Sequence, residues 1–315
     1  MTNSVKCDTI MAEGTNVAYD RSEERRKVNI MIKLQNKYVT AYINEAGAEL
    51  KSLVYNDIEY IWEGRPEVWG SSCPLLFPIC GGLKDDKYLY NGKEYTLQKH
   101  GFVRCAPFEV ERADDTYAIF CIKSNSETKK SFPFDYELRV IYTLCEKSLK
   151  IEYEVANKGE STMYFNIGSH EGYYTPDGIE NYDVIFPQKE SLNASALYGN
   201  LVANQSTPII KNSTVLPLYD KYFVVDALVF REIKSRSATL RNRKTGRTIR
   251  VDFPDMDYFL IWHKHGAPYI CLEPWNGLPD IEGSSYNIEE KEGITSLEAG
   301  KTYRNVHTIT VGEDD

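Results

Sequence analysis

The chain has 315 residues, of which 42% are hydrophobic, and it carries a formal net charge of −9 at pH 7. The acidic charge argues against nucleic acid or an anionic membrane as a partner, because phosphates and lipid headgroups are themselves negative. The seven cysteines form no C-x-x-C pair, which favours buried thiols in a reducing cytoplasm over disulfides or a zinc site. No apolar run approaches membrane length. We expect a soluble, cytoplasmic protein that acts on a small neutral metabolite.

Residues 1–27 are polar and aperiodic, and we expect them to form a poorly ordered N-terminal extension. From residue 28 onward the pattern predicts one short strand after another. The predicted strands cover residues 28–34, 38–43, 49–55, 58–62, 88–90, 93–95, 108–112, 117–123, 136–144, 149–155, 163–167, 238–242, 248–251, 258–263, 269–272 and 303–311.

Turn chemistry supports this reading most clearly at Asn91-Gly92, where both residues tolerate the positive φ of a type I′ hairpin turn. Short helical turns are expected only near residues 66–70 and 126–130. Many short strands with almost no helical periodicity predict an all-β fold, a large antiparallel β-sandwich. Because residues 28–315 contain no linker or shift in composition, we expect a single domain there.

One carboxylate stands out, because Glu273 directly follows the apolar run Ile270-Cys271-Leu272, where a neutral turn residue is expected. A buried carboxylate without partners is costly, so Glu273 should be either paired or functional. The indole rings of Trp262 and Trp275 could lie against the C–H face of a sugar. The alternative is a structural Glu that accepts backbone hydrogen bonds at a strand end.

Three further polar residues lie in unexpected surroundings: His100 before a glycine, His170 between glycines at the end of an apolar run, and Asp226 inside one. Each could be structural instead, Asp226 as a helix N-cap or turn residue. His263 and His265 form an H-x-H pair, but no further ligand at suitable spacing favours a metal site. Together, the two single histidines and two carboxylates suit proton transfer on a neutral polyol. That assignment assumes ordinary pKa values, with an ionised carboxylate as base and an imidazolium as acid.

Five motifs carry a resemblance to the aldose 1-epimerase (galactose mutarotase-like) family, in its LacX-type bacterial branch. They are LLFPICGGLKD at 75–85, HGF at 100–102, NIGSH at 166–170, DALVF at 226–230 and CLEPWNG at 271–277. The resemblance spans about residues 30–311 and implies a β-supersandwich with a sugar cleft, needing neither cofactor nor metal.

The resemblance also implies roles for individual residues. Glu273 would be the general base that removes the proton from the anomeric hydroxyl, and His170 the general acid that protonates the ring oxygen. His100 would donate a hydrogen bond to the ring oxygen or a neighbouring hydroxyl, and Asp226 would anchor hydroxyls. Trp262, Trp275 and Lys84 complete the expected monosaccharide site.

At two positions the chain departs from the family pattern. Gly82 replaces a common arginine, whose loss should weaken sugar binding or change the preferred sugar. Glu171 replaces a common proline after the catalytic histidine. A carboxylate so near His170 could raise the pKa of that histidine, or it could turn outward and have no effect. Our hypothesis is that Glu171 compensates for the missing arginine by recruiting different sugar hydroxyls.

Three other functions remain open at this point. The scaffold could serve as a non-catalytic carbohydrate-binding or regulatory protein. It could be a phosphosugar mutarotase, for which Lys84, Lys99 and Arg104 are the candidate phosphate ligands. It could also be a glycoside hydrolase that uses Glu273 with Asp226 or Glu171. The oligomeric state is not predicted.

Overall fold

The structure, a computed structural model, describes residues 30–314. Strands dominate this part of the chain, and its single α-helix is the one-turn α1 (Thr128–Ser131). The predicted all-β class is therefore confirmed. The expected N-terminal extension at 1–27 lies outside the described residues. Within them, no helix has the length and apolar character needed to cross a bilayer.

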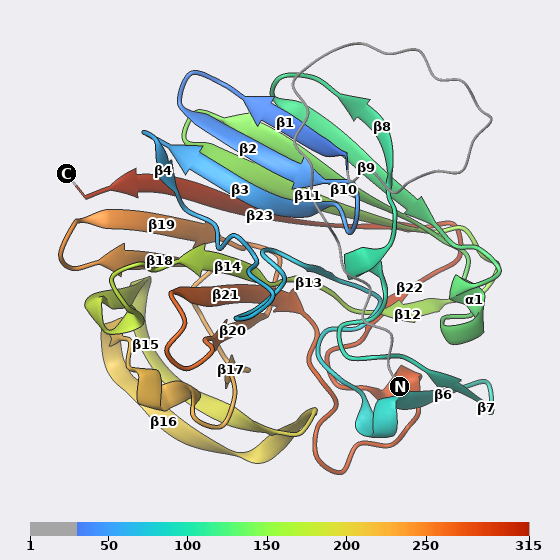
Figure 1. Ribbon diagram of the computed structural model, residues 1–315. Helices are drawn as coiled ribbons and strands as arrows, with labels where there is room; N and C mark the ends of the chain where they lie inside the picture. Colours follow the sequence, from blue (N-terminus) through green and yellow to red (C-terminus); the bar gives the residue numbers. More distant parts are fainter. Residues whose placement is uncertain (1–29, 315) are drawn as a thin grey trace.

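Two sheets form the body of the molecule (Figure 1). The smaller has four antiparallel strands: β1 (Met31–Gln35), β2 (Val39–Asn44), β3 (Glu49–Tyr55) and β4 (Ile58–Glu59). The larger has fifteen strands, and thirteen of them follow the order β5-β13-β21-β20-β17-β15-β18-β19-β23-β11-β10-β9-β8. The other two are β14, which pairs with β21, and β16, which pairs with β15.

The strands of the large sheet differ widely in length. In chain order they are β5 (Leu75–Leu76), β8 (Glu109–Ala113), β9 (Tyr117–Lys123), β10 (Tyr136–Cys145), β11 (Ser148–Asn157), β13 (Ile167–Ser169), β14 (Glu171–Tyr174), β15 (Tyr182–Tyr198), β16 (Leu201–Pro217), β17 (Leu228–Phe230), β18 (Ser237–Asn242), β19 (Arg247–Asp252), β20 (Tyr258–Trp262), β21 (Tyr269–Asn276) and β23 (Thr302–Glu313).

Smaller elements complete the described part of the chain. Two of them are two-stranded sheets: β6 (Lys87–Tyr90) pairs with β7 (Lys93–Thr96), and β12 (Met163–Phe165) pairs with β22 (Thr295–Leu297). Five short 3-10 turns are η1 (Lys84–Asp86), η2 (Val103–Cys105), η3 (Ile179–Asn181), η4 (Asp220–Phe223) and η5 (Ile288–Glu290).

The main apolar core lies between the four-stranded sheet and the large sheet. Alternation drives this packing, because every second side chain of β10 is buried while those between are partly exposed. Val140 of β10 and Phe120 of β9 share one apolar cluster with Ala41 and Leu53 of the small sheet. Tyr142 adds a polar link, since its hydroxyl donates to the Ala48 carbonyl at 2.8 Å.

Most predicted strands are present, and the Asn91-Gly92 hairpin is confirmed, with φ of 49° and 72° at its two turn residues. Two long strands were missed. β15 and β16 have 17 residues each and pair as a ribbon with several register shifts. Their outer stretches are exposed, so the buried/exposed alternation that predicts a strand is weak there.

Candidate active site

The site is built on β21, whose successive side chains alternate between two environments. Ile270 and Leu272 point into the main core, whereas Tyr269, Cys271 and Trp275 belong to separate clusters on the opposite face. Glu273 shares that opposite face and lines a cavity of about 450 Å³. The prediction that the strand ends before Glu273 is wrong, because β21 runs through it to Asn276. Continuous pairing with β20, where Leu260 opposes Glu273, holds the carboxylate in place.

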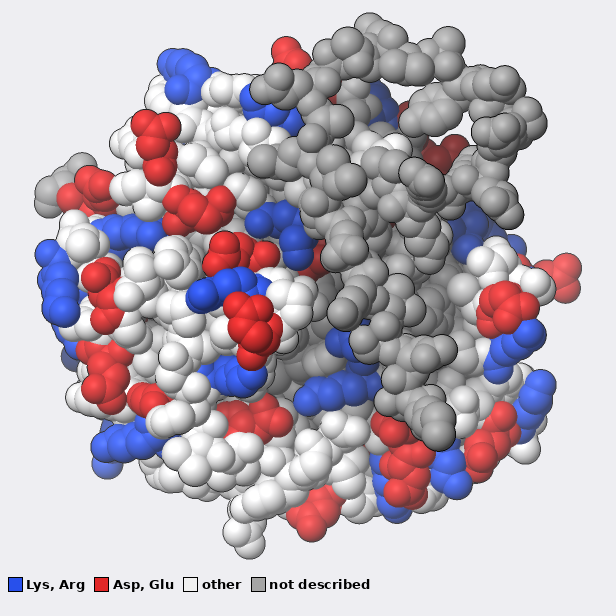
Figure 2. Space-filling model, in the orientation of Figure 1, with Lys and Arg blue, Asp and Glu red and all other residues white. Residues whose placement is uncertain are grey.

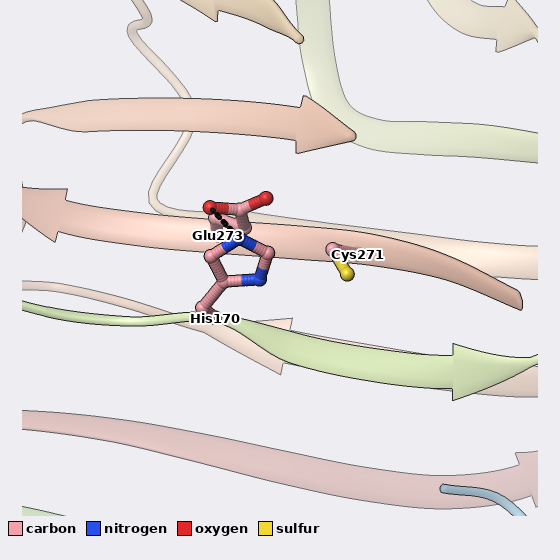
Figure 3. Close-up of side chains that lie close together, drawn as sticks. All are labelled: His170, Cys271 and Glu273. Carbon is pink, nitrogen blue, oxygen red and sulfur yellow. Dashed lines mark ion pairs between the residues drawn. The ribbon is translucent and has the colours of Figure 1, made fainter. Parts of the chain in front are cut away.

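His170 sits in a break between two short strands that both pair antiparallel with β21. Gly168 of β13 opposes Trp275, and Glu171 of β14 opposes Leu272. Continuing this register across the break places His170 opposite Glu273. Their side chains meet, with His170 Nε2 at 3.4 Å from Glu273 Oε2, as Figure 3 shows.

The glycines on either side of His170 make room for aromatic rings. A Cβ atom at Gly168 would lie 2.7 Å from Trp275 Cδ1, and one at Gly172 would lie 2.7 Å from Trp69 Cζ3. Gly172 thus leaves room for the indole of Trp69, which lies 5.2 Å from the His170 ring, centroid to centroid, and Gly168 leaves room for the indole of Trp275. Trp69 also lines the cavity, and sequence reasoning missed it. Its only sequence signal is a tryptophan in the tight turn at 66–70.

His100 borders the pair from another segment. Its ring lies edge-on to the rings of His170 and Trp275, at 5.5 and 5.7 Å. His100 Nδ1 accepts the Gly81 backbone N–H at 3.1 Å. Burial lowers the pKa of His100 well below its usual value, so the ring is neutral and its one proton sits on Nε2. His100 therefore offers a single N–H donor.

Burial controls the protonation of the central pair. It lowers the pKa of His170 to about 3, and the charges of Lys99 and Arg104 act in the same direction. Burial also raises the pKa of Glu273 well above its usual value, opposed by Lys99 and reinforced by Asp226 and Glu171. The lowered pKa of His170 favours the uncharged imidazole, and the raised pKa of Glu273 favours the protonated carboxyl. These directions differ from the ordinary pKa values that the sequence-based assignment assumed.

Among residues 30–314, Cys271 is the one further group near enough to His170 and Glu273 to complete a metal-binding set. Its sulfur and the ligand atoms of His170 and Glu273 all lie within 4.8 Å of one another. Burial raises the pKa of Cys271 well above its usual value. A cation would have to displace protons from both the thiol and the carboxyl, against the effect of burial.

The structure brings most of the predicted site residues together. Asp226, Trp262 and Trp275 line the cavity with Glu273, His170 and His100. Asp226 is a turn residue just before β17, and its carboxylate accepts the Ala227 N–H at 2.8 Å. His263 and His265 also line the cavity, but both side chains are held by Asp220.

Two predicted binding residues lie elsewhere, and these predictions are wrong. Lys84 is placed over the ring of Tyr286, with Nζ 4.7 Å from the centroid, outside the cavity lining. Glu171 points to the opposite face of its strand from His170, because successive side chains of a strand alternate. Glu171 Oε1 lies 2.8 Å from His307 Nε2 inside the core, so it cannot recruit sugar hydroxyls.

Gly82 does not leave a gap. A Cβ atom there would lie 2.5 Å from the Cβ of Asn200, which lines the cavity from the turn between β15 and β16. An asparagine amide from a distant hairpin thus fills the space beside position 82. Sequence reasoning missed Asn200 because it is remote from every motif.

Comparison with known proteins adds an independent line of evidence. Residues 31–310 match the family model of aldose 1-epimerase. The plasmid-encoded protein LacX of Lactococcus lactis subsp. lactis is 35% identical over 295 residues, covering 89% of this chain and 99% of LacX.

Solved structures show the same fold. A galactose mutarotase related enzyme from Lactobacillus acidophilus superposes with a TM-score of 0.86 at 31% identity, covering 90% of this chain and 98% of that one. A galactose mutarotase-like protein from Lactobacillus casei gives a TM-score of 0.84 at 31% identity, covering 90% of this chain and all of the other.

Proposed function

Because the chain belongs to the aldose 1-epimerase family, we propose that it interconverts the α- and β-anomers of an aldose by acid–base ring opening. The observation that carries this proposal is the facing of His170 and Glu273 at 3.4 Å on the wall of a cavity. Ring opening moves one proton off the anomeric hydroxyl and another onto the ring oxygen. It therefore needs one base and one acid held at a fixed separation.

In the proposed reaction, the Glu273 carboxylate removes the proton from O1 while the His170 imidazolium protonates O5. The C1–O5 bond breaks and C1 becomes the aldehyde carbon. Rotation about C1–C2 then presents the other face of the aldehyde to the C5 hydroxyl. Closure reverses the proton transfers and yields the second anomer, with both side chains restored.

The electrostatics of the site suit this sequence. Ring opening converts the charged pair, carboxylate and imidazolium, into a neutral pair. Burial favours neutral groups here, as the opposite pKa directions of His170 and Glu273 indicate. The site thus favours the protonation state that accompanies the open-chain sugar. Hydrogen bonds from sugar hydroxyls to Glu273 would offset the cost of forming the charged pair beforehand.

The surrounding residues have complementary roles in the proposal. The His100 N–H donates to the ring oxygen or a neighbouring hydroxyl, and the Asp226 carboxylate accepts from hydroxyls. Trp262 and Trp275 supply apolar rings for the C–H face of the sugar. All four line the same cavity as the acid–base pair, which supports these assignments.

Polarimetry of freshly dissolved single anomers tests the proposal. Wild type should accelerate mutarotation of at least one aldose above the spontaneous rate, and Glu273→Gln and His170→Asn should each abolish the acceleration. If wild type binds sugars but accelerates none of them, the protein is a carbohydrate-binding protein and the proposal is wrong.

A further inference from the structure

The turn between β15 and β16 carries a polar side chain that the proton transfers do not use. Asn200 lies in this turn, is partly exposed and lines the cavity. Leu197, near the end of β15, also lines the cavity. Within residues 30–314, the side-chain amide of Asn200 makes no hydrogen bond. The ribbon of β15 and β16 therefore places in the cavity wall an amide that is free to bind a ligand.

Hydrogen bonds to a neighbouring segment fix the position of this turn. The Val202 N–H donates to the Asp280 carbonyl at 2.8 Å, and the Glu282 N–H donates to the Val202 carbonyl at 2.9 Å. Val202 also belongs to one apolar cluster with Trp275, which lines the cavity. Because Val202 is only two residues from Asn200, these contacts hold the amide at the cavity.

The segment that holds the turn also holds position 82. The Asp280 N–H donates to the Gly82 carbonyl at 2.9 Å, and the Asp280 carboxylate accepts the Lys84 N–H at 2.9 Å. The same carboxylate forms a buried ion pair with Lys291, with Nζ 3.0 Å from Oδ1. Breaking such a pair is costly, because it leaves a buried charge without its partner. Asp280 thus holds Asn200 and Gly82 in a fixed relation to each other.

Position 82 must be small for Asn200 to lie where it does. A Cβ atom at Gly82 would lie 2.5 Å from Asn200 Cβ and 2.8 Å from Asn200 Cγ, well inside the normal separation of nonbonded carbon atoms. Gly82 is not among the glycines with positive φ, so its backbone accepts alanine without strain. The neighbouring side chain, and not the backbone, therefore requires glycine here.

The chemistry of the Asn200 side chain indicates which group of a ligand it binds. An amide combines an acceptor oxygen with two N–H donors, which suits a hydroxyl because a hydroxyl also accepts and donates. Acidic and basic side chains are interspersed over the visible face of the protein (Figure 2), whereas residues 191–210, which include the turn, contain no charged residue. No charged group of the turn therefore competes with an uncharged hydroxyl for the amide.

We propose that Asn200 is a specificity-determining residue that forms a hydrogen bond with one hydroxyl of the aldose, and that Gly82 makes room for it. The inference rests on the proposed function for the identity of the ligand as an aldose. It assigns sugar preference to a turn that lies outside every sequence motif, together with the position at which the chain departs from the family pattern.

Calorimetric binding tests the role of Asn200 without requiring turnover. The ligands are D-glucose, D-galactose and the 2-, 3-, 4- and 6-deoxy forms of whichever hexose wild type binds more tightly. At least one deoxy sugar should bind wild type about 3- to 10-fold more weakly than its parent, the range for one lost neutral hydrogen bond. Asn200→Ala should bind the parent equally weakly and no longer distinguish it from that deoxy sugar. Asn193→Ala, in the exposed part of β15, is the matched control and should change no affinity.

Gly82→Ala tests the second half of the proposal. The added methyl group should displace the amide and weaken binding of the parent sugar by a similar factor. Asn200→Gly removes the Cβ atom that this methyl group would meet. The double variant Gly82→Ala/Asn200→Gly should therefore bind no more weakly than Asn200→Gly alone. Additive losses would show that position 82 acts independently of Asn200, and this half of the proposal would be wrong.

The remaining outcomes separate this inference from the proposed function. If Asn200→Ala ranks every deoxy sugar as wild type does, or if wild type binds neither hexose, the assignment of Asn200 is overturned. In mutarotation, Asn200→Ala should raise KM and leave kcat unchanged, because a hydrogen bond to a non-reacting hydroxyl is the same before and during ring opening. Sugar binding that depends on Asn200 without accelerated mutarotation would leave the assignment standing while the proposed function failed.

Discussion

Residues His170 and Glu171 are neighbours, yet they form two His–Glu pairs in opposite environments. His170 meets Glu273 at 3.4 Å beside the cavity, and its side chain keeps 11% of its surface exposed. Glu171 meets His307 at 2.8 Å in the core, where the two side chains are 3% and 0% exposed. The rings of His307 and Tyr153 lie 5.5 Å apart, and Tyr173 belongs to the same apolar core.

The comparison shows that residue type and burial do not by themselves define an active site. Both pairs join an imidazole to a carboxylate in a mostly apolar setting. Only the His170–Glu273 pair borders a space that a ligand could fill. The Glu171–His307 pair connects β14 to β23, so its expected contribution is to hold the strand that carries His170. The first pair should therefore respond to mutation in activity, and the second in stability.

The largest expected effect is on catalysis. Glu273→Gln should reduce the acceleration of mutarotation by about 10²–10⁴-fold, the usual contribution of a positioned acid–base group. Thermal stability should change little, because the amide has nearly the size of the neutral carboxyl that it replaces and leaves the same number of buried polar atoms. Polarimetry measures the effect on mutarotation, and a thermal melt measures the effect on stability. Wild-type activity in the variant would show that the two pairs are not functionally different.

Breaking the core pair should give the next largest effect, on folding. His307→Leu leaves the Glu171 carboxylate buried without its partner, which should lower the free energy of unfolding by about 3–5 kcal/mol. The double variant Glu171→Leu/His307→Leu should recover much of this loss. Urea denaturation measures both. A double variant no more stable than the single one would mean that the pair itself is not the source of the cost.

Overpacking the strand beside His170 should have a moderate effect. Gly168→Ala places a methyl group 2.7 Å from Trp275 Cδ1 and 2.9 Å from Cys80 Sγ. We expect a loss of about 1–3 kcal/mol in stability together with weaker sugar binding, because Trp275 must shift. Gly312→Ala in β23 is the control, since its nearest neighbour is Thr248 Oγ1 at 3.6 Å. Equal losses in the two variants would argue against a specific role for Gly168.

The smallest expected effect is on the pH dependence of stability. The pKa of His170 is lowered to about 3, so between pH 6.5 and that value the unfolded state binds the proton and the folded state does not. Stability must therefore fall as the pH falls. Between pH 6.5 and 5 the contribution of His170 is about 1–2 kcal/mol. In thermal melts between pH 6.5 and 5, the stability of His170→Asn should fall less with pH than that of wild type. An identical pH dependence in the two proteins would contradict a lowered pKa for His170.

Features that depend on short stretches of chain could be predicted without the fold. Alternation along β10 and the positive φ tolerance of Asn91-Gly92 are local properties, so the all-β class and this hairpin could be predicted. Two further local signals were a histidine between glycines at position 170 and a carboxylate directly after an apolar run at position 273. That was enough to select His170, Glu273, His100 and Asp226, which the fold places around one cavity.

The face that each strand presents, and the distant segments that meet there, depend on how the whole chain packs. The pairing of β14 with β21 turned Glu171 into the core toward His307, although its sequence position beside His170 suggested the cleft. Packing placed Trp69 and Asn200 in the cavity wall and left Lys84 outside it. Burial then shifted the pKa values of His170 and Glu273 in opposite directions. Each of these depends on contacts between residues far apart in the chain, and a local pattern carries no information about such contacts.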